Sequence, residues 1–213
     1  MRPVKTQSEV RRESAEATRR RIIDAAQRLF VEKGYASTSI KEVAAAASVA
    51  VQTIYWTFGN KAALVSGIRD AWLTRAHTAE RLQAVLVIKD PHDRLAAAAA
   101  FMRHQWETGA EAVAVQQDAM WSDREIRRTV EAVLENRAQA LAPIVEALNG
   151  HLRRDLEAEE ALDIFIALLG FELYRELRNR GWSADRYEAW LARTLQESLL
   201  RRAGDTGPPA AER

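Results

Sequence analysis

The sequence predicts an all-α protein of about nine helices, and three observations support this class. The strict apolar–polar alternation of a half-buried strand occurs nowhere in the 213 residues. Apolar residues instead recur at three- and four-residue spacing in one segment after another. Helix-boundary residues bracket those segments, as Gly34 does after Lys33 and Ser39 does before Ile40. We expect a small N-terminal three-helix domain followed by a larger helical domain.

Composition narrows the class of protein further. The chain is 47% apolar and contains no low-complexity run, as expected of a globular fold. It contains no cysteine, which excludes disulfides, thiolate metal sites and thiol redox sensing. No apolar run approaches the roughly 20 residues that span a bilayer, and the charged N-terminus does not resemble a signal peptide. We therefore expect a cytoplasmic protein with no membrane partner.

Charge is unevenly distributed along the chain. Residues 1–61 contain 11 Lys and Arg against 6 Asp and Glu, a net charge of +5, whereas the whole chain carries only +1. The remainder is therefore acidic, with a net charge of −4. A basic end on an otherwise acidic chain favours a nucleic-acid contact at that end, although such an imbalance also arises by chance.

The N-terminal segment is predicted to be a flexible basic arm followed by a helix. Residues 1–17 are polar and show no apolar periodicity, so we assign them to the arm. The first helix is expected over residues 19–33, with Ile22, Ala26, Leu29 and Phe30 on its buried side. It belongs to a domain predicted to span residues 18–65.

The stretch from Ser39 to Lys61 predicts a helix, a tight turn and a second helix. Ser39 and Glu42 form a capping box for a helix over residues 40–46, whose alanines permit close packing of a partner helix. Residues 48–50 form the turn, and the second helix runs over residues 51–58 with Ile54 and Phe58 facing inward. Its outward face carries amide, hydroxyl and aromatic groups rather than charges. Such groups bond base edges and phosphates and contact thymine methyls.

This segment resembles the DNA-binding domain of TetR-type transcriptional repressors, over about residues 19–65. The matching positions are Gly34-Tyr35, Thr38-Ser39, Val43-Ala44, Ala47 to Ala50, Thr53-Ile54-Tyr55, Phe58 and Lys61. Two positions depart from the pattern. Ser48 replaces the usual turn glycine, so either it bears the strain of a left-handed conformation or the turn avoids positive φ. Ala50 replaces a serine, which removes an N-cap and a phosphate contact.

The resemblance implies a repressor that a small-molecule ligand releases from a palindromic operator, acting as a homodimer. Two copies are expected to place their second helices in successive major grooves. The residues expected to contact DNA are Thr38, Val51, Gln52, Thr53, Tyr55, Trp56, Thr57 and Lys61.

Residues 66–203 are predicted to form the effector-binding and dimerisation domain, followed by a disordered tail over 204–213. Helices are expected over 60–86, 91–108 and 111–121, then from a second Ser-x-x-Glu box at Ser122 to about residue 149, kinked at Pro143. Two more are expected over 157–180 and 183–202, and the first of these is apolar on nearly all sides.

Two functional surfaces are predicted within this domain. Aromatic and Met side chains with a few polar groups are typical of a ligand pocket, although such a stripe is more often plain core. The expected pocket residues are Phe101, Met102, Gln105, Trp106, Gln117, Met120 and Trp121. Surplus apolar surface in the last two helices predicts a two-fold, four-helix dimer contact. Its expected residues are Phe165, Leu169, Leu173, Trp190, Leu191 and Leu195.

Catalytic and metal sites are not expected. No two of the four histidines are four residues apart, and no glycine-rich phosphate loop or nucleophile elbow is present. We therefore expect no enzyme, no cofactor and no metal. Two alternatives remain open: a DNA-binding repressor without a ligand, and an all-α enzyme or small-molecule-binding protein. The second does not explain the uncharged outward face at Gln52 to Thr57.

Overall fold

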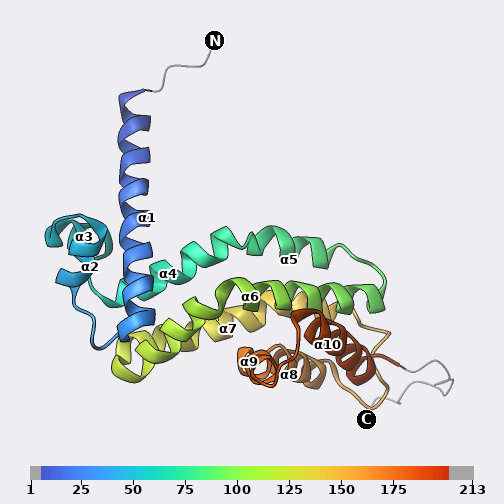
Figure 1. Cartoon of the computed structure of the whole chain (residues 1–213). Coiled ribbons are helices and arrows are strands. Elements are labelled where there is room, and N and C mark those ends of the chain that lie inside the picture. Colours follow the sequence, from blue (N-terminus) through green and yellow to red (C-terminus); the bar gives the residue numbers. More distant parts are fainter. Residues whose placement is uncertain (1–5, 202–213) are drawn as a thin grey trace. The chain divides into compact units, whose positions relative to one another are not determined.

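The computed structural model describes residues 6–201, which form ten α-helices (Figure 1). The helices are α1 Gln7–Lys33, α2 Ile40–Ala47, α3 Val51–Phe58, α4 Ala62–Arg75, α5 Thr78–Leu86, α6 Pro91–Ser122, α7 Arg124–Glu146, α8 Ala158–Leu168, α9 Phe171–Asn179 and α10 Ala184–Leu199. The all-α class is confirmed, since the only β pairing within residues 6–201 is an isolated bridge between Leu152 and Leu200. None of the described helices is long and apolar enough to cross a membrane.

The chain forms two compact units, and α6 contributes to both. Unit 1 contains Met1–Arg75 and Gly109–Glu131; unit 2 contains Ala76–Thr108 and Ala132–Arg213. The core of unit 1 includes completely buried side chains from α1 to α4, among them Ile22, Val43, Ile54, Leu64 and Ile68. Residues 109–131, which are distant in the sequence, therefore belong to the same compact unit as the N-terminal helices.

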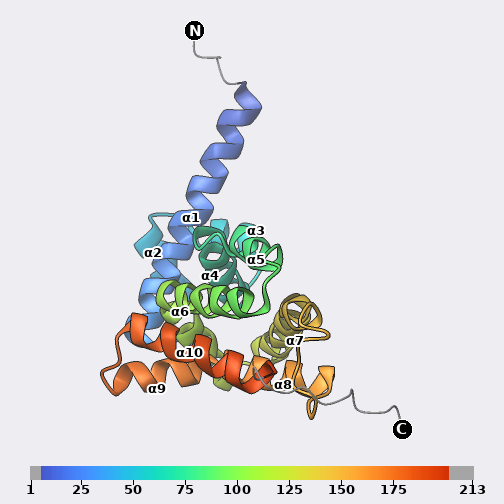
Figure 2. The same cartoon turned by 90° about the vertical axis from the view of Figure 1, so that its right-hand side faces the viewer.

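The first helix begins earlier than expected. Thr6 and Glu9 form a capping box, and no Gly or Pro interrupts the residues that follow, so α1 starts at Gln7 rather than at Arg19. Residues 7–17 of the predicted arm are therefore helical and solvent-exposed. This part of α1 extends beyond α2 and α3 (Figures 1 and 2). Residues 1–5 of the arm and the predicted tail over 204–213 lie outside the described residues.

The single helix predicted over residues 60–86 is wrong, because the chain breaks between α4 and α5. His77 has φ 50° and ψ 42°, a left-handed conformation that ends one helix and precedes the next. Histidine tolerates this conformation better than most residues, but it is not a recognised helix stop. Asn60 caps the start of α4 as expected, with its Oδ1 accepting from the Ala63 amide at 2.8 Å.

Gly109 does not end a helix, contrary to the sequence prediction. It lies within the continuous α6, where a Cβ atom would meet the indole of Trp72 at 2.2 Å. The glycine is there because α4 and α6 approach closely within unit 1, not because the helix stops. The two helices predicted over 91–108 and 111–121 are therefore one.

Two further predicted boundaries are corrected. Asp123, not Ser122, caps α7, since its Oδ1 accepts from the amides of Glu125 and Ile126 at 2.8 and 3.3 Å. The helix predicted over 157–180 breaks at Gly170, which serves as the N-cap of α9. The apolar residues on both sides of Gly170 predict one continuous helix, whereas this glycine separates α8 from α9.

Four of the six residues predicted for a dimer contact form the core of unit 2 instead. Phe165, Leu169, Leu191 and Leu195 are all 0% exposed within the single chain. They are buried because α8 packs on α10, so the apolar stripe of each helix already has a partner. Leu173 and Trp190 are half-buried.

The fit between α4 and α6 yields the first prediction. Gly109→Ala places a methyl group inside the Trp72 ring, and we expect it to destabilise the protein by about 1–3 kcal/mol despite alanine's better helix propensity. Urea denaturation measures the change. The double variant Gly109→Ala/Trp72→Phe is the control, because the smaller phenylalanine ring makes room for the methyl group. We expect its loss in the free energy of unfolding to be smaller than the sum of the losses of the two single variants. A stabilised Gly109→Ala protein would contradict the close approach.

Candidate nucleic-acid interface

The position of α2 is set by polar contacts at its first turn. Ser39 Oγ accepts from the Glu42 amide at 3.2 Å, and the Glu42 carboxylate accepts from the Ser39 amide at 2.8 Å, which confirms the predicted capping box. Lys33 at the end of α1 pairs with Glu42 at 2.8 Å. The hydrogen bond from Lys33, followed by those from Ser39, lowers the pKa of Glu42 to about 2. The end of α1 is thereby joined to the start of α2.

The turn between α2 and α3 uses a left-handed residue. Ser48 has φ 53° and ψ 51°, and the next amide, that of Val49, donates to the Ala44 carbonyl at 3.0 Å. Of the two alternatives left by the missing glycine, Ser48 therefore bears the strain. Ala50, the N-cap of α3, makes no side-chain cap, so the helix begins with unsatisfied amides.

The outward face of α3 is as uncharged as the sequence predicts. Ile54 is completely buried and holds the helix on the unit, whereas Trp56 is 79% exposed and Tyr55 is 45% exposed. Gln52 and Thr57 are also exposed, and Val51 and Thr53 are half-buried. Thr57 donates its hydroxyl to the Thr53 carbonyl at 2.7 Å, so its methyl group is the freer part. The face therefore offers an amide, two large aromatic rings and hydroxyl-bearing side chains.

Thr38 is corrected as a DNA-contacting side chain. It is only 2% exposed, and its hydroxyl lies within hydrogen-bond distance of the carbonyls of Gly34, at 2.9 Å, and Leu29, at 3.3 Å. These contacts fasten the chain after α1 to the end of that helix. The threonine of the sequence pattern thus has a structural role here.

Lys61 already has partners within unit 1. Its ammonium donates to the Tyr35 carbonyl and lies 4.1 Å from the centre of the Tyr35 ring. Loss of hydration lowers its pKa, and Asp123 and Asp118 oppose that change. A phosphate contact by Lys61 remains a prediction, and it requires the ammonium to share or leave the Tyr35 carbonyl.

Tyr35 anchors the loop that precedes α2, a role the sequence reasoning missed. Its amide donates to Asp118 Oδ2 at 2.6 Å and its hydroxyl donates to Asp123 Oδ2 at 3.3 Å. Burial, with help from Asp123, raises the pKa of the Tyr35 hydroxyl, which stays protonated. Both aspartates lie more than 80 residues away in the sequence, so no local pattern indicates the contact.

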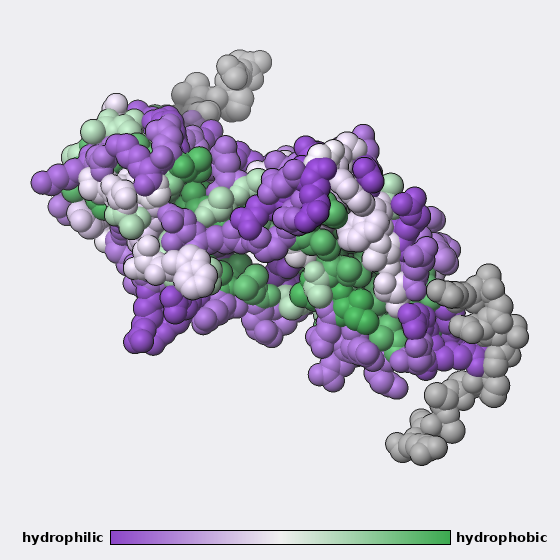
Figure 3. Space-filling view, turned by 60° about the horizontal axis from the view of Figure 1, so that its bottom comes forward, coloured by the Kyte–Doolittle hydropathy of each residue, from purple (hydrophilic) through white to green (hydrophobic). Residues whose placement is uncertain are grey.

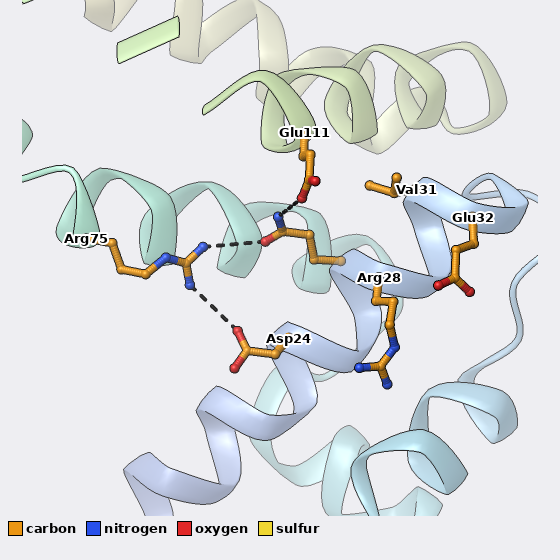
Figure 4. A pocket seen from close by; sticks show the side chains of 7 residues that line it. Asp24, Arg28, Val31, Glu32, Arg75 and Glu111 are labelled. Carbon is orange, nitrogen blue, oxygen red and sulfur yellow. Dashed lines mark hydrogen bonds and ion pairs between the residues drawn. The ribbon is translucent and has the colours of Figure 1, made fainter. Parts of the chain in front are cut away.

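Two of the cavities in the described part of unit 1 border its helices. The larger, about 360 Å³, is lined by charged side chains of α1, α4 and α6 (Figure 4). Arg75 contacts Asp24 at 3.6 Å and Gln27 at 3.5 Å, and Gln27 donates to Glu111 at 2.8 Å. The smaller, about 160 Å³, is lined by α4, α6 and α7 residues including Ser66, Gln116 and Glu125. The polar lining of the larger cavity does not suit an apolar ligand.

The predicted pocket residues do not form one group. Phe101, Met102, Gln105 and Trp106 are buried in unit 2. Gln117, Met120 and Trp121 belong to unit 1, and Trp121 is 76% exposed. Trp121 is corrected as an enclosed pocket residue because of this exposure, and the Arg127 guanidinium lies 5.8 Å from the centre of its ring. The sequence predicts one pocket for these seven residues because they lie close together along α6.

Two helices joined by a three-residue turn with the left-handed Ser48 at its start, the second helix presenting an uncharged face, define a helix-turn-helix motif. Residues 22–68 match the family model described as bacterial regulatory proteins, tetR family. The transcriptional regulator TtgR of Pseudomonas putida is 43% identical over 60 residues, which is 28% of this chain and 29% of TtgR. AcrR of Shigella flexneri is 35% identical over 97 residues, 46% of this chain and 44% of AcrR. The N-terminal segment is thus similar to the TetR family, and the chain spans less than half the length of either relative.

Solved structures extend the likeness of fold beyond that domain. SmeT in complex with triclosan has a TM-score of 0.69 at 19% identity, covering 92% of this chain and all of SmeT. A regulator from Saccharomonospora viridis in complex with choline has a TM-score of 0.65 at 21% identity, covering 86% of this chain and 98% of that one. At such identities the likeness shows the fold alone. The TetR-like fold predicted from the sequence, with an N-terminal helix-turn-helix and a larger helical domain, is confirmed.

The strained turn yields a prediction. Ser48→Gly removes the left-handed penalty and is expected to stabilise unit 1 by about 1 kcal/mol. Ala45→Gly, on the exposed side of α2, is the matched control and is expected to destabilise by a similar amount. Thermal melting of both variants gives the comparison. Destabilisation by Ser48→Gly would mean that the serine makes an interaction worth more than the strain.

Proposed function

We propose that this protein is a sequence-specific, DNA-binding transcriptional regulator, a repressor that a small molecule releases from a palindromic operator. The observation that carries the proposal is the exposed, uncharged face of α3, on a domain that matches the TetR family. Gln52 is placed to read a base edge, and Tyr55 and Trp56 to contact sugars, phosphates or a thymine methyl. Such a regulator acts in the cytoplasm, where its DNA target lies.

A homodimer is part of the proposal, with a revised contact surface. With Phe165 and Leu169 in the core, the apolar side chains left at the surface of α8 are half-exposed, among them Leu162 and Ile166, which lie four residues apart. Figure 3 shows apolar side chains gathered on the face of unit 2 that bears the last helices. A second copy pairing through this face supports binding to two half-sites.

A small-molecule effector is also part of the proposal. SmeT was solved with triclosan and the Saccharomonospora viridis regulator with choline, so two proteins of this fold hold small molecules. The buried polar and aromatic side chains of α6 in unit 2, described below, support a ligand site there.

Base readout by α3 is tested with Gln52→Ala. A randomised-DNA selection identifies the operator first, and gel-shift titrations then compare single base changes. We expect Gln52→Ala to relax the preference at one base pair per half-site, by about 1–3 kcal/mol, while other positions keep theirs. Gln83→Ala, on an exposed position of α5, is the matched control. An unchanged preference would exclude Gln52 from base readout, and failure of the wild type to select any sequence would refute the proposed function.

Dimerisation through α8 is tested with Ile166→Glu. Because Ile166 is half-exposed in the single chain, the charge should leave helix content intact and shift the protein to monomers that bind the operator at least tenfold more weakly. Leu195→Glu should instead unfold unit 2, since Leu195 is completely buried. Gln83→Glu adds the same charge elsewhere as a control. Light scattering and circular dichroism decide between these outcomes, and a dimeric Ile166→Glu protein would place the contact on another face.

A further inference from the structure

Two of the buried hydrogen-bonding groups without a hydrogen-bond partner in the described part of unit 2 belong to aromatic side chains. The indole N–H of Trp106 on α6 and the hydroxyl of Tyr187 on α10 make no hydrogen bond in the structure. Trp106 is 5% exposed and Tyr187 is completely buried. Burial raises the pKa of the Tyr187 hydroxyl, and the neighbouring Arg137 and Trp106 oppose that rise. Buried polar groups are almost always satisfied, so this pair points to an absent acceptor.

Arg137 on α7 brings a positive charge to the same place. Its guanidinium carbon lies 5.3 Å from the centre of the Trp106 ring, and Nη2 donates to the Leu169 carbonyl at 2.8 Å. No carboxylate among residues 6–201 contributes to the pKa shift of Arg137, and loss of hydration lowers that pKa. A poorly hydrated guanidinium with one carbonyl partner has N–H donors to spare and favours an anion.

Aromatic rings surround these groups. The Phe171 ring is tilted against the Trp106 ring with 5.3 Å between the ring centres, and Tyr174 meets Tyr187 edge-on at 4.9 Å. Phe171 and Arg137 keep partial solvent exposure, whereas Trp106 and Tyr187 are buried. The cluster therefore offers a ligand aromatic faces, one cation at Arg137, and two hydrogen-bond donors at Trp106 and Tyr187.

We propose that this cluster binds an apolar organic acid, with a flat aromatic carboxylate as the preferred ligand. The carboxylate accepts from Arg137, and the Trp106 N–H and the Tyr187 hydroxyl donate to its remaining lone pairs. The ring of the acid packs beside Phe171. This inference names the chemical class of the effector and therefore rests on the proposed function for its biological role, although binding itself does not require DNA.

The competing explanation is that Arg137 is purely structural. Leu169 is the C-cap of α8, and a cation bonded to a terminal carbonyl stabilises a helix end without any ligand. That explanation predicts a lower melting temperature for Arg137→Gln and no interaction with acids. It leaves the unpaired Trp106 and Tyr187 groups without a purpose.

Calorimetric titration of the full-length protein without DNA tests the proposal, using 2-naphthoate, its neutral isostere 2-naphthamide, and octanoate as an aliphatic acid. We expect 2-naphthoate to bind at least tenfold more tightly than 2-naphthamide. Arg137→Gln should abolish that preference and Arg137→Lys should retain part of it. Arg193→Gln, which removes a charge from an exposed position of α10, is the matched control and should change nothing.

Variants that keep the packing make the test independent of folding. Tyr187→Phe and Trp106→Phe each remove a donor but keep a ring, so both should stay folded by circular dichroism and weaken 2-naphthoate binding several-fold. Equal binding of 2-naphthoate and 2-naphthamide, or no binding of either acid by the folded wild type, overturns the proposal. Tighter binding of octanoate overturns the aromatic preference, and an unaltered preference in folded Arg137→Gln overturns the role of Arg137.

Gel-shift assays with the selected operator separate this proposal from the proposed function. DNA binding without acid binding rejects the acid ligand alone. Acid binding without DNA binding rejects the regulator alone.

Discussion

The helix-turn-helix depends on contacts to a segment that is distant in sequence. Tyr35 is held by Asp118 and Asp123, and Gly109 admits the Trp72 ring, so residues 109–131 belong to the same compact unit as α1 to α4. A segment of about 45 residues is marginal by itself, because it buries too small a share of its surface. The placement of α2 and α3 therefore relies on α6 as much as on their own sequence.

Local patterns in the sequence predicted the N-terminal elements well. Ser39 with Glu42 marked the start of α2, and Ile54 marked the buried side of α3, because caps and helical periodicity depend on neighbours within a few residues. The resemblance added the family and the fold. The same approach misplaced the start of α1, the break at His77 and several helix boundaries in the C-terminal half. Gly109 and Gly170 are both glycines in apolar surroundings, yet one sits inside a helix and the other separates two. Only the packing of Trp72 distinguishes the first, and that packing is not a local property.

The candidate sites show the same division. The exposed face of α3 was predictable, since outward positions follow from the helical repeat. Thr38 was misassigned because a threonine before a helix start has the same local pattern whether its hydroxyl points outward or bonds the carbonyl of Gly34. The dimer residues were misassigned for a related reason: an apolar helix identifies buried surface, but not whether the same chain or another covers it. Arg137 was missed altogether, since its significance lies in the rings around it rather than in its sequence neighbours.

The bare N-terminus of α3 has a thermodynamic consequence. The helix is eight residues long, has only Ile54 fully buried, and receives no side-chain cap from Ala50. Short helices with so few anchors open locally at little cost, so α3 is expected to exchange its amide hydrogens faster than the core helices of its unit. On the proposed function, part of the free energy of operator binding is then spent on ordering this helix. Substitutions that stabilise α3 in the free protein are then expected to raise the affinity for DNA even where they do not contact DNA.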